Sequence, residues 1–311
     1  MRPVAELRQP GAPPSTTTAL YPSVHRTPMK RRLLPALFVF SATAFAAEAP
    51  PLFRAHGVTI NVPDLAAGAK FYTEFWGFTE GERSPDGTAI ALRPDDRPYT
   101  HVTLRLAPRT GHARYRRDAH SDLAIEVDDI RAVLARAAER KLPLLDDHVR
   151  IEQVGLAIAV ADPWGGFVFA LDPTRKPPPP ARLPRIYNFG VYLPINAYAR
   201  AREFWCDQLG FITQTDRYLP LDQALFSADK AWGFMLHMRE GARPARGDYP
   251  GYSQPILQLA TPDLDAALAR LRAANAEILT PAPVRDAWGR RLAAFREPFG
   301  VPFEVLEIAR E

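Results

Sequence analysis

The sequence predicts an α+β protein in which four β-α-β-β-β modules form two tandem domains with cupped mixed sheets. Two observations predict this fold. The chain repeats itself at a nearly constant offset, and inside each repeat the spacing of apolar residues changes from two to about 3.6. A chain of 311 residues, of which 47% are hydrophobic and 24% charged, is long enough for two globular domains.

The internal repeat covers most of the chain. Residues 57–78 align with residues 190–211 at an offset of 133, with matching Gly-Val, aromatic and Gly-Phe positions. Residues 127–145 align with residues 261–279 at an offset of 134. A nearly constant offset over this length indicates a duplicated domain.

The boundaries of the two domains follow from the repeat and from a proline-rich segment. Residues 174–184 contain four consecutive prolines, which favour an extended, semi-rigid linker. We therefore expect one domain at residues 54–173 and the other at residues 185–308.

Each half divides again into two modules. Asp64-Leu65 recurs as Asp129-Ile130 in the same half and as Asp263-Leu264 in the second half. Each aspartate precedes an amphipathic stripe, as the N-cap residue of a helix does. A strand pattern with apolar residues at every second position, such as residues 58–62, comes before the helix, and short strand patterns follow it.

The N-terminal segment predicts export. Residues 30–32 are basic, residues 33–40 are apolar, and small residues follow up to Ala47. These are the three parts of a signal peptide, and the apolar part is too short to span a bilayer comfortably. We expect residues 29–47 to be a cleaved signal peptide, residues 1–28 to be disordered or a misassigned start, and the mature protein to be periplasmic or secreted. The alternative is an uncleaved membrane anchor.

The net charge of +4 does not indicate a nucleic-acid partner. Residues 1–47 contain six of the 39 basic residues but only one of the 35 acidic residues, so the rest of the chain is close to neutral. The single cysteine, Cys206, excludes an intramolecular disulfide and any cysteine-rich zinc site.

Short motifs follow one another in the same order in both halves. They are Val62-Pro-Asp-Leu, Glu126-Val-Asp-Asp-Ile and Asp162-Pro-Trp-Gly-Gly, then Thr261-Pro-Asp-Leu and Glu297-Pro-Phe-Gly. Their order and spacing resemble the vicinal oxygen chelate superfamily, which includes glyoxalase I, bleomycin-resistance proteins and extradiol dioxygenases. The resemblance implies that paired modules curl their sheets into cups, and that metal-dependent members direct one imidazole or carboxylate per central strand into the cup.

Carried over to this chain, the family's ligand positions contain few metal ligands. Gly57 and Gly190 stand at the first position, and the adjacent His56 is expected on the opposite face of its strand. The other positions contain Asp122 and Ile256, then Phe169 and Glu304, then Thr103 or Arg105 with His237. Whether modules pair within or across the halves, no cup receives three good ligands, so the sequence predicts no cofactor.

The leading functional prediction is an exported, metal-independent protein that binds a small organic molecule in a cup. The residues expected to bind this ligand are Arg105, Asp122, Phe169, Tyr192 and Gln258. Rim positions for stacking are expected from Trp164, Trp232, Trp288 and Phe299, although core or loop-anchor roles suit each of them equally. Because both halves are on one chain, we expect a monomer.

Two other functions remain open from the sequence. One is a lyase or dioxygenase with a divalent metal and a reduced site, in which Glu304 is a ligand or general base and His237 is its partner. The other is a structural protein whose duplicated domains only present a surface to a partner.

Overall fold

The computed structural model describes residues 51–94, 101–109, 119–145, 150–152, 155–173, 185–213, 222–226, 233–239, 243 and 248–309. The expected signal peptide, the expected linker at residues 174–184 and Trp232 lie outside these residues. All that follows concerns the unit formed by residues 49–311. In the part that is described, no helix combines the length and the apolar character needed to cross a membrane.

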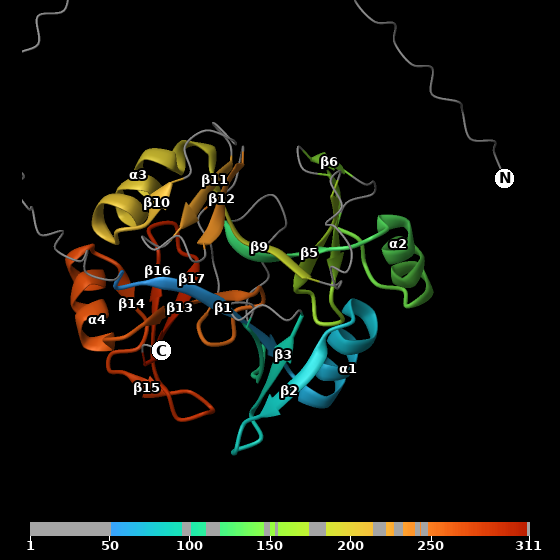
Figure 1. Ribbon diagram of the computed structural model, residues 1–311, viewed down its shortest axis with the longest axis horizontal. Coiled ribbons are helices and arrows are strands. Elements are labelled where there is room, and N and C mark those ends of the chain that lie inside the picture. Colours follow the sequence, from blue (N-terminus) through green and yellow to red (C-terminus); the bar gives the residue numbers. More distant parts are fainter. Residues whose placement is uncertain are drawn as a thin grey trace, which may run out of the picture. The chain divides into compact units, whose positions relative to one another are not determined.

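The four modules follow one another along the chain as the sequence predicts (Figure 1). The first contains β1 (Arg54–Val62), α1 (Leu65–Trp76), β2 (Thr79–Arg83), β3 (Ala89–Arg93) and β4 (His101–Leu106). The second contains β5 (His120–Glu126), α2 (Ile130–Glu139), β6 (Arg150–Glu152), β7 (Gly155–Ala161) and β8 (Phe167–Pro173).

The second half repeats this order with small additions. The third module contains β9 (Arg185–Pro194), a 3-10 turn (Ile195–Ala197), α3 (Tyr198–Arg202), a π-helical segment (Glu203–Gln208), β10 (Ile212–Thr213), β11 (Asp222–Phe226) and β12 (Gly233–Arg239). The fourth contains β13 (Ile256–Thr261), α4 (Leu264–Ala273), β14 (Glu277–Ile278), β15 (Val284–Arg285), β16 (Arg291–Arg296) and β17 (Pro302–Glu307). Cys206 lies half-buried in the π-helical segment, where burial raises the pKa of its thiol to about 11.

The helix caps are the ones expected from the sequence. Asp64, Asp129 and Asp263 each accept a hydrogen bond from a backbone N–H in the first turn of their helix, which satisfies one of the donors that a helix N-terminus leaves free. Gly77 ends α1 in the left-handed conformation, with φ 75°, where a glycine avoids the steric cost of a Cβ atom.

The modules pair across the halves to form two sheets. In the first sheet the strand order is β14-β16-β17-β13-β1-β4-β3-β2, and β15 pairs with β16. In the second sheet the order is β10-β11-β12-β9-β5-β8-β7-β6. The antiparallel pairs β1–β13 and β5–β9 join the halves. Each sheet therefore combines one module from each half, which is one of the two pairings left open by the sequence.

The helices contact each other within each half, whereas each sheet combines strands from both halves. The guanidinium carbon of Arg136 in α2 lies 5.6 Å from the ring centre of Phe75 in α1. Arg270 of α4 donates a hydrogen bond to the backbone oxygen of Gln208, which ends the third module's helical segment. In Figure 1, accordingly, α1 and α2 lie on one side of the unit and α3 and α4 on the other.

Alternation along the central strands separates an apolar face from a polar one. The apolar positions are fully buried and join one core with the helices, as the sequence predicts: Val58, Ile60, Val62, Leu123, Ile125, Leu257 and Leu259. Val62 shows this packing directly, since a Cβ atom on Gly68 of α1 would lie only 3.0 Å from its side chain. The opposite face of the first sheet carries Thr59, Asn61, Gln258 and Glu304, all of them buried.

The turns before β8 and β17 contain carboxylates at equivalent positions but with different partners. Asp162 pairs with both terminal nitrogens of Arg109, at 2.9 and 2.8 Å, and accepts a hydrogen bond from the Tyr72 hydroxyl. Among the described residues, Glu297 accepts hydrogen bonds from the backbone N–H groups of Phe299 and Val301, both on Oε1. Its Oε2 is buried without a hydrogen-bond partner in the described part of the chain. Burial raises the pKa of Glu297 to about 8.

We expect Glu297 to make the protein less stable as the pH rises from about 4.5 to about 8. The folded chain keeps the Glu297 proton over this range and the unfolded chain releases it. The contribution of Glu297 to the free energy of unfolding is therefore complete below the unfolded pKa of 4.5 and is lost as the pH rises through 8.

Urea unfolding of the parent protein and of the Glu297→Gln variant, at about pH 5 and about pH 8, measures this effect. The variant should gain stability relative to the parent as the pH rises, because glutamine has nearly the same shape and does not titrate. The same difference at both pH values would contradict the expectation.

Candidate functional site

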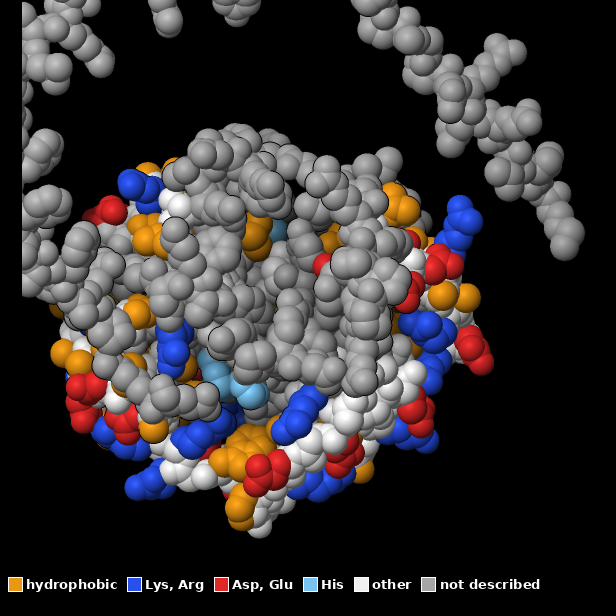
Figure 2. Space-filling model, viewed as in Figure 1, with side chains coloured by type: hydrophobic (Ala, Val, Ile, Leu, Met, Phe, Trp, Pro, Cys, Tyr) orange, Lys and Arg blue, Asp and Glu red, His pale blue; other side chains and the backbone are white. Residues whose placement is uncertain are grey.

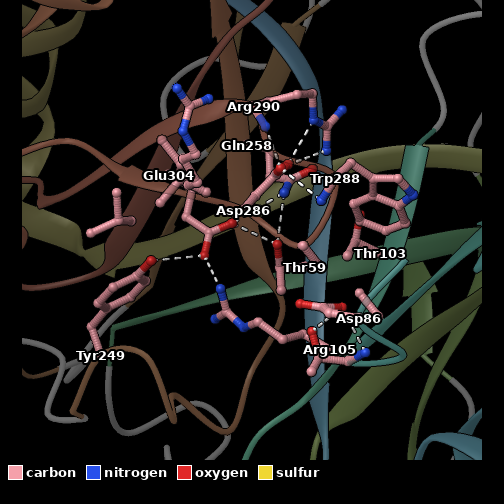
Figure 3. A pocket seen from close by; sticks show the side chains of 16 residues that line it. Thr59, Asp86, Thr103, Arg105, Tyr249, Gln258, Asp286, Trp288, Arg290 and Glu304 are labelled. Carbon is pink, nitrogen blue, oxygen red and sulfur yellow. Dashed lines mark hydrogen bonds and ion pairs between the residues drawn. The ribbon is translucent and has the colours of Figure 1, made fainter. Parts of the chain in front are cut away.

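The polar face of the first sheet converges on one carboxylate. Glu304 of β17 is fully buried and lies beside Gln258 of β13 in the parallel ladder. Its Oε2 accepts hydrogen bonds from Thr59 Oγ1 at 2.6 Å and from Gln258 Nε2 at 3.1 Å. Its Oε1 accepts from Arg105 Nη1 at 2.5 Å and from the Tyr249 hydroxyl at 3.2 Å (Figure 3). We call the space around these five residues the first cup.

The environment of Glu304 favours its ionised form. Burial alone would raise the pKa of this carboxyl group, but the Arg105 guanidinium and the hydrogen bonds from Thr59 and Gln258 outweigh burial and lower the pKa. Burial and the charge of Glu304 raise the pKa of Tyr249, so this hydroxyl remains a donor at neutral pH. The floor of the first cup is thus a carboxylate with a complete set of donors.

Arg105 connects the floor of the cup to the segment that precedes β13. Its Nε donates to Asn61 Oδ1 at 2.9 Å and its Nη2 donates to the Pro250 backbone oxygen at 3.0 Å. Asn61 Nδ2 also donates to the backbone oxygens of Pro250 and Tyr252. Each nitrogen of the guanidinium group therefore has an acceptor, and the segment that carries Tyr249 is fixed against the sheet.

A cavity of about 230 Å³ opens above this floor. Two hairpin loops bound it: Asp86 and Thr88 come from the loop between β2 and β3, and Trp288 comes from the loop between β15 and β16. Thr103 of β4 lies on the same wall as Trp288 (Figure 3). On the face shown in Figure 2, the described Lys and Arg side chains are interspersed with Asp and Glu.

The second sheet forms a cup with a different content, which we call the second cup. Tyr192 of β9 stacks on His120 with ring centres 4.7 Å apart and on His237 at 4.6 Å. Phe169 stacks on the same tyrosine at 5.8 Å. A row of rings therefore covers the floor of this cup, and Tyr192 is only 5% exposed.

Gly190 explains how Asp122 and His237 come close together. A Cβ atom on Gly190 would overlap with Asp122 Oδ1 and would lie 3.0 Å from His237 Cδ2. The two side chains therefore approach the same point above a strand position that has no side chain. Asp122 itself is 1% exposed.

The structure divides the site residues expected from the sequence into two groups. Arg105, Gln258 and Glu304 meet in the first cup. The other group, in the second cup, consists of Asp122, Phe169, Tyr192 and His237. Glu304 and His237 belong to different sheets, so the structure does not bring together the reduced site that the sequence suggested for them.

Sequence reasoning missed several residues around the first cup. Tyr249 lies between modules, where the repeat provides no alignment and no signal. Asp286 and Arg290 form an ion pair at 2.6 Å beside Trp288. They lie in a hairpin that the comparison of motifs between the halves did not include. The Asp-x-Trp-Gly pattern at residue 286, which resembles the one at residue 162, is a signal that could have identified this turn.

Among the described residues, neither cup has a donor set that fits the metal of the family. In the first cup, Glu304 is the single carboxylate at the floor and a guanidinium group lies 2.5 Å from it, in the place that a cation would need. In the second cup Asp122 and His237 approach one point, whereas the ring of His120 stacks on Tyr192, and first-row metals need about three ligands at one point. Among the residues that the structure describes, no group of three or more His, Cys, Asp and Glu side chains could coordinate an ion.

The glycine at the family's first ligand position is required by the backbone. A Cβ atom on Gly57 would collide with the backbone oxygen of His101 in the neighbouring strand. The register of β1 against β13 shifts between Ala55 and Gly57, so simple alternation does not apply to His56. His56 stacks on His101 with ring centres 4.4 Å apart, and burial together with the nearby charges lowers its pKa to about 3.

Comparison with known proteins gives a family and a fold. The family described as "Glyoxalase/Bleomycin resistance protein/Dioxygenase superfamily" matches residues 54–171 and 189–305. Glyoxalase I from Zea mays is similar with a TM-score of 0.54 and 17% identity, over 82% of this chain and 92% of that chain. A candidate dioxygenase from Bacillus subtilis is similar with a TM-score of 0.56 and 15% identity, over 83% of this chain and 86% of that one. A search of curated proteins gives no match.

We expect Gly57→Ala to destabilise the protein more than Gly289→Ala does. The added methyl group at residue 57 meets backbone that cannot move freely, whereas Gly289 has open space and only the strain of its positive φ of 80°. That strain costs about 1–2 kcal/mol. Denaturant midpoints of both variants compare the two costs, and equal losses would show that β1 and β4 do not approach as closely as the structure has them.

We expect Arg105→Met to lower the free energy of unfolding by about 3 kcal/mol at neutral pH, because it leaves the Glu304 charge buried without a partner. The loss should decrease as the pH falls, since protonation then neutralises Glu304. Adding Glu304→Gln should recover most of the loss.

Arg291→Met is the matched control, because Arg291 forms its ion pairs with Asp265 and Glu307 at the surface. It should cost much less than Arg105→Met. Denaturant unfolding at several pH values measures both, and equal losses in the two variants would contradict the central role of the Arg105–Glu304 pair.

Proposed function

The chain belongs to the Glyoxalase/Bleomycin resistance protein/Dioxygenase superfamily, and from this premise we propose that it binds a small organic molecule in the first cup without a metal ion. One observation carries the proposal. Glu304, the residue best placed to be a metal ligand, is instead neutralised by Arg105 and accepts three further hydrogen bonds. A carboxylate has about four acceptor sites, so this set leaves none for a cation.

Energetics supports the same proposal. A metal ion at Glu304 would have to displace the guanidinium group of Arg105, which has acceptors on all its nitrogens. Displacement would cost the guanidinium group its ion pair and its hydrogen bonds to Asn61 and Pro250. These contacts support a polar pocket that does not need an ion.

The cavity above the floor has the size of a small ligand. Its volume of about 230 Å³ exceeds the ~150 Å³ of a cavity that holds benzene and is below the ~300–1,000 Å³ of most drug-sized sites. Trp288 and Tyr249 provide ring surfaces beside polar groups, which is the usual composition of such sites. Export is part of the proposal, supported by residues 29–47, and so is a monomeric state, supported by both halves on one chain.

The competing function is a metal-dependent lyase or dioxygenase. In this structure its residues would be Asp122 and His237 in the second cup, because these two side chains approach one point above Gly190. The first-cup proposal and this alternative differ in metal content and in the residue on which metal binding depends.

We expect purified protein to contain far less than one equivalent of zinc, nickel, manganese or iron by elemental analysis. A thermal-shift screen of small planar compounds should find ligands whose effect is unchanged by EDTA. A ligand at 100 times its dissociation constant should add about 2.7 kcal/mol to the free energy of unfolding. Stoichiometric metal that is lost in Glu304→Ala or in Asp122→Ala would refute metal independence and identify the cup that contains the ion.

A further inference from the structure

Gln258 in the first cup has a fixed orientation. Its side chain is 96% buried, and its Nε2 donates to Thr59 Oγ1 at 2.8 Å and to Glu304 Oε2 at 3.1 Å. Because a carboxylate only accepts hydrogen bonds, the amide NH2 must face Glu304 and the amide oxygen must point elsewhere. The carboxylate therefore decides which end of the amide remains for other partners.

The amide oxygen of Gln258 is a hydrogen-bond acceptor without a donor among the described residues of this site. Oε1 is buried and has no donor in the described part of the chain, while Gln258 lines the cavity. Buried acceptors without a donor are rare in folded proteins, because each costs about 1–3 kcal/mol. A ligand in the cavity can remove this cost if it brings an N–H or O–H group and the Gln258 amide shifts enough to expose its buried oxygen.

Two of the three carboxylates that line the cavity are already ion-paired. Glu304 pairs with Arg105 and Asp286 pairs with Arg290. Asp86 Oδ1 accepts hydrogen bonds from the hydroxyl groups of Ser84 and Thr88 and from the backbone N–H of Thr88, and Arg285 donates to the backbone oxygen of Gly289. The acidic side chains of the lining, three in number, equal the arginines. Asp86 and Arg285 are exposed, so water screens their charges. A charged ligand would lose its hydration and gain little attraction from them, so the cavity favours a neutral one.

The shape of the cavity favours a flat molecule. Trp288 forms one wall, with the guanidinium carbon of Arg290 5.3 Å from the centre of its ring system. Aromatic walls prefer stacked or edge-on rings. A volume of about 230 Å³, compared with ~150 Å³ for a benzene cavity, leaves room for one or two rings.

From these observations we infer that the ligand of the first cup is a neutral, flat molecule of one or two rings that donates an N–H or O–H hydrogen bond to Gln258 Oε1 and stacks on Trp288. Phenols, lactams and ring N–H compounds belong to this class. The inference rests on the proposed function and specifies its ligand.

Pairs of compounds that differ by one methyl group test the donor. The probes are 2-quinolone, indole and 2-naphthol, each with its N-methyl or O-methyl derivative, and 2-naphthoate as the anionic comparison. Isothermal titration calorimetry with the full chain should give about tenfold tighter binding for each donor than for its methyl derivative, the value of one hydrogen bond. The anion 2-naphthoate should bind most weakly.

Two variants assign the effect to its residues. Gln258→Met preserves the length of the side chain and removes the amide oxygen, so the preference for donors should fall to about onefold while the methyl derivatives still bind. Trp288→Ala, in a half-exposed hairpin position, should weaken the binding of every compound and leave the preference for donors unchanged. If Gln258→Met does not fold, the affinities of the parent protein for each donor and its methyl derivative still test the inference.

The outcomes separate the two proposals. Equal affinities within the methyl pairs, or an unchanged preference in Gln258→Met, overturn the inference and leave the proposed function in place. Tighter binding of 2-naphthoate than of 2-naphthol also overturns it. If none of the probes binds, both the inference and the proposed function fail, and a bound water is then the donor to Gln258.

Discussion

The ion pair between Arg105 and Glu304 is the constraint on which the first cup depends. Glu304 comes from the fourth module and has no accessible surface, so its charge must be balanced by protein groups. Arg105 comes from the first module, 199 residues earlier in the chain, and it also fixes the segment around Pro250. The pair therefore links the two halves electrostatically as well as structurally, and it converts a ligand position of the family into a neutral floor.

The two cups show how one frame supports different chemistry. Both are built around an antiparallel pair of strands from opposite halves, β1 with β13 and β5 with β9. In the first, hydrogen-bonding side chains surround a carboxylate and leave a cavity. In the second, stacked rings around Tyr192 fill the floor beside Asp122. The backbone is common to both, so the difference arises from side chains at equivalent strand positions.

Residues at equivalent positions of the two halves can also have different roles. Gly57 has no side chain because the backbone of His101 is too close, whereas at Gly190 the space is taken by Asp122 and His237. Asp162 and Glu297 occupy equivalent turns, but Asp162 has an arginine partner, whereas one oxygen of Glu297 has no hydrogen-bond partner among the described residues. Duplicated domains thus conserve the local turn while the longer-range partners of each residue diverge.

Local patterns in the chain are sufficient to predict the modules, the caps at Asp64, Asp129 and Asp263, and the apolar faces of the central strands. These features depend on residues close together in the chain, and periodicity reports them directly. Which modules share a sheet depends on contacts between distant segments, because both pairings satisfy the same local patterns. That choice places Glu304 with Arg105 and separates it from His237. The bulge beside His56 and the approach of Tyr249 to Glu304 likewise depend on contacts between distant segments, which a single sequence does not encode in any local spacing.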